Sequence, residues 1–229
     1  MTFLAAQPSD ASSARDRRER FGLVLSGLVI AFAVQGVAEP SAWEQVLVSA
    51  LLATTLLLAL WAADIRPRLM RWAIVIAGLL IAVSVVGAAS GHVDSAAARL
   101  SNLALVTLAP PALVVGVVRS LRARNQVTVE AVFGVLCLYI LLGMFFAFLY
   151  GAIGRLSGTF FAQEQPVTVS HCLYFSFTTL TTVGYGDLTA ASNLGHTLSV
   201  TEALSGQIYL VTVVSVIVGN LGRIRRSGA

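Results

Sequence analysis

Hydrophobic residues occur in long runs along this chain, and short polar segments separate the runs. Five runs are long enough to cross a membrane and contain no charged residue: 22–38, 45–63, 72–90, 101–118 and 131–152. A sixth run, 197–221, contains a single acid, Glu202. Because about 20 mostly apolar residues are needed to cross roughly 30 Å of hydrocarbon, the pattern predicts six membrane-spanning helices.

A shorter apolar stretch lies between the fifth and sixth runs. Its sequence is VTVSHCLYFSFTTL, residues 167–180. The stretch is apolar enough to be buried but too short to cross the membrane, so it predicts a re-entrant helix.

Composition and charge agree with a membrane location. The chain is 57% hydrophobic and 11% charged, whereas about a quarter of the residues in soluble domains are charged. All basic residues are arginines, and a topology with both chain ends in the cytoplasm places 13 of the 15 on the inner side. This distribution predicts a multi-pass protein of the cell membrane with cytoplasmic N- and C-termini. It also accounts for the high isoelectric point without a nucleic-acid partner.

The segment TTLTTVGYGD, residues 178–187, follows the short helix. Irregular backbone at membrane depth is tolerated where it is buried in protein or lines water. If successive residues alternate between right- and left-handed conformations, their carbonyl groups all point to one side. Left-handed geometry is cheap only for glycine, and Gly184 and Gly186 flank Tyr185. Four such segments around an axis would stack rings of oxygens from Thr182, Val183, Gly184 and Tyr185.

The stretch YFSFTTLTTVGYGD, residues 174–187, closely resembles the pore helix and signature filter of potassium channels. In that family, carbonyl rings replace the hydration shell of the ion. The resemblance implies an all-α membrane protein with six transmembrane helices, and a re-entrant pore helix and selectivity filter between helices five and six. It also implies a homotetramer that holds potassium ions in the filter, with no other cofactor. The motif likeness covers 167–221, whereas over 1–130 only the helix count is similar.

The same resemblance assigns roles around the filter. The ion-binding residues are Thr182, Val183, Gly184, Tyr185 and Gly186. Tyr174 is expected to hydrogen-bond Asp187, and Phe175 is expected to pack near the Tyr185 ring. Thr178 completes the expected support of the filter from the pore helix. Glu202 lies five residues before Gln207, about 140° around the helix, so we expect it to hydrogen-bond behind the filter, towards the pore helix or the fifth span.

The sixth span is expected to line the cavity below the filter. Gly206 stands where potassium channels often carry a flexible inner-helix glycine. Four residues at helical spacing form the predicted pore face: Gln207, Leu210, Val214 and Val218. Gln207 and Leu210 would meet the cavity, while the two valines would narrow it and gate by dewetting. In the alternative interpretation, these valines face a neighbouring helix.

We expect three parts: a disordered cytoplasmic tail at 1–20, a four-helix bundle at 21–125 and a pore domain at 126–229. The bundle resembles a voltage sensor, but its fourth span has no charge, and Arg99 and Arg119 only bracket it. Pro110 and Pro111 interrupt this span. The bundle is therefore expected to pack around the pore, bind membrane lipids or transmit another stimulus. The sequence leaves open whether it packs on its own pore or on a neighbour's.

The function predicted from these features is passive conduction of potassium with little or no voltage dependence. Nothing in the sequence suggests an enzyme or a soluble small-molecule substrate. The alternatives are a potassium-translocating carrier subunit, a voltage-gated channel with an atypical sensor and a non-conducting regulatory subunit, the last of which the complete TVGYGD motif disfavours. The carrier is disfavoured because such proteins usually supply four degenerate pore repeats in one chain, and this chain has one intact filter.

Overall fold

The computed structural model describes residues 8–37, 42–62, 67–89, 100–108, 110–111, 114–115, 129–163 and 166–226. Within these helices, residues 8–18, 42–45, 62, 88, 129–131, 214 and 216–226 are described by their backbone only. The regular structure of the described part is helical, apart from one antiparallel bridge between Phe161 and Ala190.

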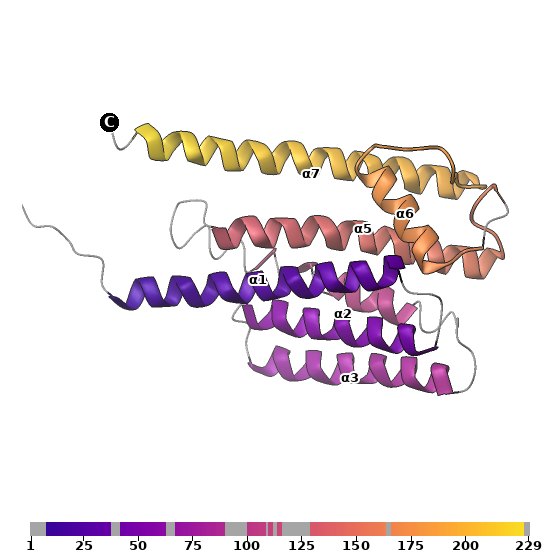
Figure 1. The fold of residues 1–229 in the computed structure, drawn as a ribbon, viewed down its shortest axis with the longest axis horizontal. Coiled ribbons are helices and arrows are strands. Elements are labelled where there is room, and N and C mark those ends of the chain that lie inside the picture. The colour runs from indigo at the N-terminus through magenta and orange to yellow at the C-terminus, as the bar shows by residue number, and fades with distance from the viewer. Residues whose placement is uncertain are drawn as a thin grey trace, which may run out of the picture.

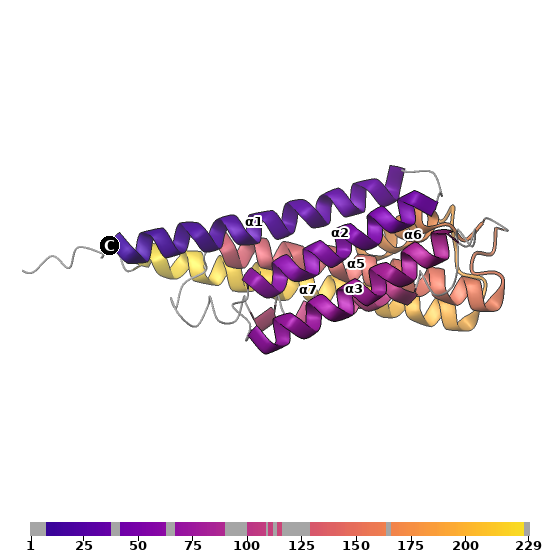
Figure 2. The same cartoon turned by 90° about the horizontal axis from the view of Figure 1, so that it is seen from below.

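Five long helices form a row, and a short helix is inserted at one end of it (Figures 1 and 2). The first three are α1 (Pro8–Val37), α2 (Ala42–Ala62) and α3 (Pro67–Ala89). The remaining three are α5 (Val129–Ser157), α6 (Val169–Leu180) and α7 (Asn193–Arg226). Contacts run in the order α3, α2, α1, α5 and α7, and the short α6 touches α5, α7 and α1.

Three described helices are apolar and long enough to cross a membrane: Glu19–Val37, Pro67–Gly87 and Val132–Ser157. They coincide with the predicted first, third and fifth spans. A shorter apolar helix, Val46–Trp61, lies within the predicted second span. Of the fourth span, the structure describes helical residues 101–108, 110–111 and 114–115, while the others lie outside the described residues. Helix α7 covers the whole sixth span, but side chains beyond residue 215 are not described. The protein is therefore a membrane protein with several candidate spans.

The N-terminal segment differs from the expectation for the tail. Helix α1 begins at Pro8, so most of the segment 1–20 is helical rather than disordered. The run ASSARDRRER before the first span contains four arginines, two alanines and one glutamate. These residues have high helix propensity, so the helix of the first span extends backwards through them.

Helix α1 joins the α1–α3 bundle to the α5–α7 region of the same chain. The rings of Phe32 on α1 and Phe177 on α6 lie 4.7 Å apart, and the Ser170 hydroxyl donates to the Gly36 carbonyl at 3.2 Å. Gly143 on α5 makes room for this contact, since a Cβ there would lie 2.7 Å from the Phe177 ring. Helix α1 thus packs on α5 and α6 of the same chain.

Helix α3 lies at the outer edge of the row. Only 11% of its span is buried within the protein, compared with 44% of the α5 span. Its exposed side chains include Trp72, Ile74, Val75, Leu79 and Val86. A contiguous apolar face of this kind is rare on soluble monomers, but it is the surface that a helix in contact with lipid presents.

Candidate functional site

The backbone alternates in handedness along the segment TVGYG. Thr182, Gly184 and Gly186 have φ values of 58°, 54° and 80°, whereas Val183 and Tyr185 between them do not have positive φ. A Cβ added at either glycine would meet no atom within 4 Å, so glycine is required there by conformation and not by space. Alternation of this kind turns successive carbonyl groups towards one side of the chain.

The left-handed conformation of Thr182 was not predicted from the sequence, although Thr182 itself was assigned to the filter. A β-branched residue is an outlier at positive φ, and the left-handed conformation costs a non-glycine residue about 1–2 kcal/mol. Three hydrogen bonds near Thr182 offset that cost. Its N–H donates to the Thr179 carbonyl at 2.9 Å, its hydroxyl accepts from Gln207 Nε2 at 3.0 Å, and the Gly184 N–H donates to the Thr178 carbonyl at 3.1 Å.

Helix α6 positions the inner end of this segment. The helix starts where the Thr168 hydroxyl accepts the His171 N–H at 3.1 Å, which is a typical N-cap. At the other end of α6, the carbonyl groups of Thr178 and Thr179 accept no hydrogen bond from within the helix. The Gly184 N–H donates to the Thr178 carbonyl instead, and the Thr182 N–H donates to the Thr179 carbonyl. The end of α6 and the start of the TVGYG segment therefore form one hydrogen-bonded unit.

The outer end of the segment is held by Tyr174. Its hydroxyl donates to Asp187 Oδ2 at 2.7 Å, and its ring stacks on the Tyr185 ring with centroids 6.2 Å apart and planes 5° from parallel. The hydrogen bond to Asp187 raises the pKa of Tyr174 to about 12. The hydroxyl therefore stays protonated, and remains a donor, at neutral pH.

The predicted contact between Phe175 and the Tyr185 ring is wrong. Phe175 packs on the opposite side of α6, against Tyr150, Phe160 and Phe161, with ring centroids 5.3, 5.8 and 5.6 Å away. Successive residues on a helix point about 100° apart. Because Tyr174 faces the TVGYG segment, its neighbour Phe175 is turned towards α5.

Helix α7 approaches α6 most closely at Gly206. A Cβ at Gly206 would clash with the carbonyl oxygen of Leu180, the last residue of α6. The same oxygen accepts a hydrogen bond of 3.4 Å from the Tyr139 hydroxyl. Gly206 therefore allows the two helices to touch, and α7 is an unbroken helix at this point. The hinge role of Gly206 stays a prediction.

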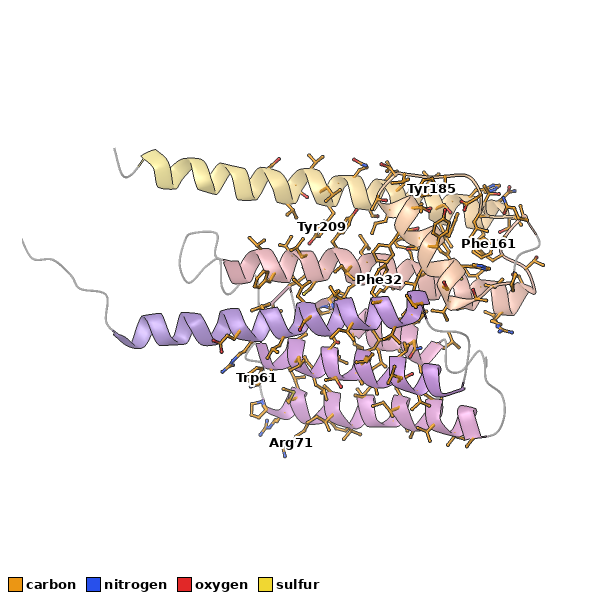
Figure 3. All side chains as sticks on the ribbon, in the orientation of Figure 1. Phe32, Trp61, Arg71, Phe161, Tyr185 and Tyr209 are labelled. Carbon is orange, nitrogen blue, oxygen red and sulfur yellow. The ribbon has the colours of Figure 1, made fainter. Side chains whose placement is uncertain are left out.

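The middle of α7 is joined to α5 by Tyr209. Its hydroxyl donates to the Val135 carbonyl at 2.5 Å, and its ring lies 5.5 Å from that of Tyr139. Figure 3 shows Tyr209 between the two helices. On the predicted pore face, Gln207 and Leu210 are exposed. The side chains of Val214 and Val218 lie outside the described residues.

Glu202 lies behind the segment, in the direction that helical spacing predicts. It is completely buried and contacts two side chains from different helices. The Tyr150 hydroxyl on α5 donates to its Oε2 at 2.6 Å, and the Ser176 hydroxyl on α6 hydrogen-bonds its Oε1. Sequence reasoning did not single out either partner. The signal available was the lone acid itself, because a buried carboxyl group requires hydrogen-bond partners on the helices around it.

A single chain leaves the TVGYG segment uncovered. Val183 is 53% exposed and Tyr185 is 71% exposed. The adjoining face of α7 also exposes apolar side chains, namely Leu204, Ile208 and Val211. An open strip of backbone oxygens with an uncovered apolar helix beside it is a surface that further copies of the chain could enclose.

Comparison with known families agrees with this geometry. Residues 134–222 match the family described as ion channel. Over these residues the chain is similar to ion channels. The match spans α6, the TVGYG segment and most of α5 and α7, and it is to a transport family and not to an enzyme family. No curated protein matches the chain.

Proposed function

We propose that the protein is a homotetrameric channel that conducts potassium passively through the TVGYG segment. The observation that carries the proposal is the alternation of backbone handedness at Thr182, Gly184 and Gly186. A run of carbonyl groups on one side of the chain offers an ion a substitute for its hydration shell. At about 3.3 Å per extended residue, the four residues from Thr182 to Tyr185 span on the order of 13 Å. That length has room for several ions, which can displace one another.

Four chains are proposed because each chain contributes one filter strip. The exposure of Val183 and Tyr185, together with the apolar face of α7, supports assembly around a central axis. In such an assembly, the strips would face one another and the α7 helices would line the cavity below. The alternative, a carrier subunit, would function without four identical chains and is separated from a channel by molecular mass in detergent.

Weak voltage dependence is proposed from the chemistry of the bundle. The described parts of its predicted spans contain no charged side chain. Its buried polar side chains include Ser49, Ser84 and Asn102, and Ser49 hydrogen-bonds the other two at 2.8 and 2.7 Å. Moving one charge through 100 mV is worth about 2.3 kcal/mol, and neutral groups contribute nothing to this term. The alternative is a voltage-gated channel whose sensor lies elsewhere.

The orientation in the membrane is proposed from arginine and tryptophan side chains at one end of the row. The Arg20 guanidinium lies 4.0 Å from the centroid of the Trp61 ring, and Arg68, Arg71 and Trp72 line a surface pocket. Figure 3 shows Trp61 and Arg71 at one end and Tyr185 at the other. Tryptophan marks either membrane interface, and arginine favours the cytoplasmic side. We therefore assign this end to the cytoplasmic lipid headgroups and the filter to the outer half of the membrane.

The proposal is tested with the purified chain in planar bilayers, with potassium on one side and sodium on the other. We expect a reversal potential close to that of potassium and an open probability that is nearly flat in voltage. Light scattering in detergent is expected to give the mass of four chains. A tetrameric protein whose current reverses near zero would contradict potassium selectivity. A steeply voltage-dependent current would favour the atypical-sensor alternative.

A further inference from the structure

Three buried side chains from three helices meet behind the filter. They are Tyr150 on α5, Ser176 on α6 and Glu202 on α7, each 0% exposed. The Tyr150 hydroxyl donates to Glu202 Oε2 at 2.6 Å, and Ser176 Oγ hydrogen-bonds Glu202 Oε1. Ser176 Oγ also lies 2.7 Å from the carbonyl oxygen of Gly143 on α5. We call these three side chains the carboxyl cluster.

The carboxyl cluster contains three short oxygen–oxygen contacts, and each needs one proton. The Tyr150 hydroxyl supplies the first. Ser176 has only one proton, although Oγ touches both the Gly143 carbonyl and Glu202. If Glu202 were a carboxylate, one of these two contacts would bring acceptor oxygens together without a hydrogen. A proton on Glu202 removes the deficit, because Glu202 then donates to Ser176 and Ser176 donates to Gly143.

The surroundings of the cluster also favour an uncharged acid. Both hydrogen-bond partners of Glu202 are neutral hydroxyl groups. Among the residues that the structure describes, the other polar or titratable groups recorded beside the cluster include Tyr139, Cys172 and Ser199, and none of these three is basic. An ionised carboxylate buried without a cation carries a large desolvation cost, which a neutral acid with two hydrogen bonds avoids.

We propose that Glu202 is a neutral carboxylic acid and that its proton joins α7 to α6 through Ser176. Ser176 lies two and three residues before Thr178 and Thr179, whose carbonyls bind the N–H groups of the TVGYG segment. The hydrogen bond between Glu202 and Ser176 therefore fixes the position of the Thr178 and Thr179 carbonyl groups relative to α7. Glu202 is thus a positioning residue for the filter, acting through Ser176. This role rests on the proposed channel function, whereas the protonation of Glu202 does not.

The protonation is tested first, by infrared spectroscopy of the full chain in lipid vesicles. We expect a carboxylic acid C=O band that is present in the wild type, persists at neutral pH and is missing in Glu202→Gln. If the wild-type and Glu202→Gln spectra both lack this band at neutral pH, Glu202 is ionised and the proposal is overturned. This readout is valid whether or not the protein conducts potassium.

The positioning role is tested by variants in the bilayer recording. Glutamine can donate its amide N–H to Ser176 and accept from Tyr150, so Glu202→Gln is expected to keep the wild-type selectivity and thermal stability of the tetramer. Ser176→Ala and Glu202→Ala break the link. Each is expected to lower the potassium-to-sodium permeability ratio by about tenfold, which is the equivalent of one hydrogen bond. If Glu202→Gln loses selectivity as Glu202→Ala does, the neutral-acid link is refuted. If Ser176→Ala keeps full selectivity, the route through Ser176 is refuted. A wild type without selective current would instead refute the proposed function.

Discussion

The α1–α3 bundle and the α5–α7 region both contain buried hydroxyl groups, but these groups have different surroundings in the two regions. Both bury hydroxyl groups between apolar helices, as Ser49 and Ser84 do in the bundle and Ser176 does behind the filter. In the bundle, Ser49 hydrogen-bonds Ser84 and Asn102, and Ser84 also donates to the Leu80 carbonyl of its own helix. In the α5–α7 region, Ser176 hydrogen-bonds the buried acid Glu202, and the strained TVGYG backbone nearby stays exposed in a single chain. The bundle therefore buries these hydroxyl groups within one chain, whereas in the proposed tetramer other copies of the chain would enclose the TVGYG segment.

The largest effect is expected from Gly184→Ala. Alanine at a φ of 54° raises the conformational free energy by about 1–2 kcal/mol per chain. In the proposed tetramer this destabilisation would occur four times in one filter. We expect the loss of selective potassium current with the tetramer intact. The matched control is Gly78→Ala on α3, where an added Cβ also meets nothing within 4 Å but the backbone is helical. Equal currents in both variants would contradict the assignment of the filter backbone.

The next effect concerns the contact between α7 and α6. Gly206→Ala places a methyl group against the Leu180 carbonyl, and we expect the free energy of unfolding to fall by about 1–3 kcal/mol, the usual cost of overpacking. Denaturant titration in detergent measures this change. Gly36→Ala, a helical glycine of α1 with open space around it, serves as the control. A tolerated Gly206→Ala with unchanged gating would argue against close packing as the role of this glycine.

A third variant separates the bundle from the pore region. Phe32→Ala removes the ring that packs on Phe177. Aromatic pairs contribute about 0.5–1.5 kcal/mol beyond their buried area, so the midpoint of thermal unfolding is expected to fall. Val29→Ala, at an exposed position on the same helix, is expected to leave it unchanged. Equal midpoints for the two variants would mean that the bundle and pore region are energetically independent.

A smaller effect is expected from Tyr174→Phe. The substitution keeps the ring that stacks on Tyr185 but removes the donor to Asp187, so single-channel openings are expected to become a few-fold shorter. Tyr139→Phe removes a longer hydrogen bond, 3.4 Å to the Leu180 carbonyl, and is expected to change the openings less. Because the pKa of Tyr174 is raised to about 12, its hydroxyl stays protonated below about pH 10, and the difference between variants should not depend on pH there. Unchanged openings in Tyr174→Phe would remove this support role.

The smallest effect is expected from Ser84→Ala in the bundle, the counterpart of Ser176→Ala behind the filter. The bundle variant loses a hydrogen bond to Ser49, and we expect the free energy of unfolding to fall by about 0.5–1.5 kcal/mol with the permeability ratio unchanged. Bilayer recording beside a denaturant titration provides both numbers. A shift in selectivity as large as that of Ser176→Ala would remove the distinction between the two regions.

The features that could be predicted from the sequence depend on its composition and on the helical period of about 3.6 residues. Long apolar runs locate the helices, the two glycines mark the left-handed positions, and helical spacing gives the direction of Glu202. Features that depend on which helices touch were missed. The positive φ of Thr182 arises from hydrogen bonds to α6 and to Gln207, which no local pattern reveals. The Phe175 contact was misassigned because resemblance placed two adjacent aromatics on the same side of one helix.

The contact between α1 and its own chain's α6 also has a consequence for mixed assemblies. Phe32 and Ser170 connect the bundle to the short helix α6 of the same chain, so the proposed tetramer would contain four separate bundle–pore units. A Phe32→Ala chain mixed with wild type should then change the behaviour in proportion to the number of altered chains. In tetramers of known composition, the midpoint of thermal unfolding would then fall by an equal step for each Phe32→Ala chain and not in one abrupt transition.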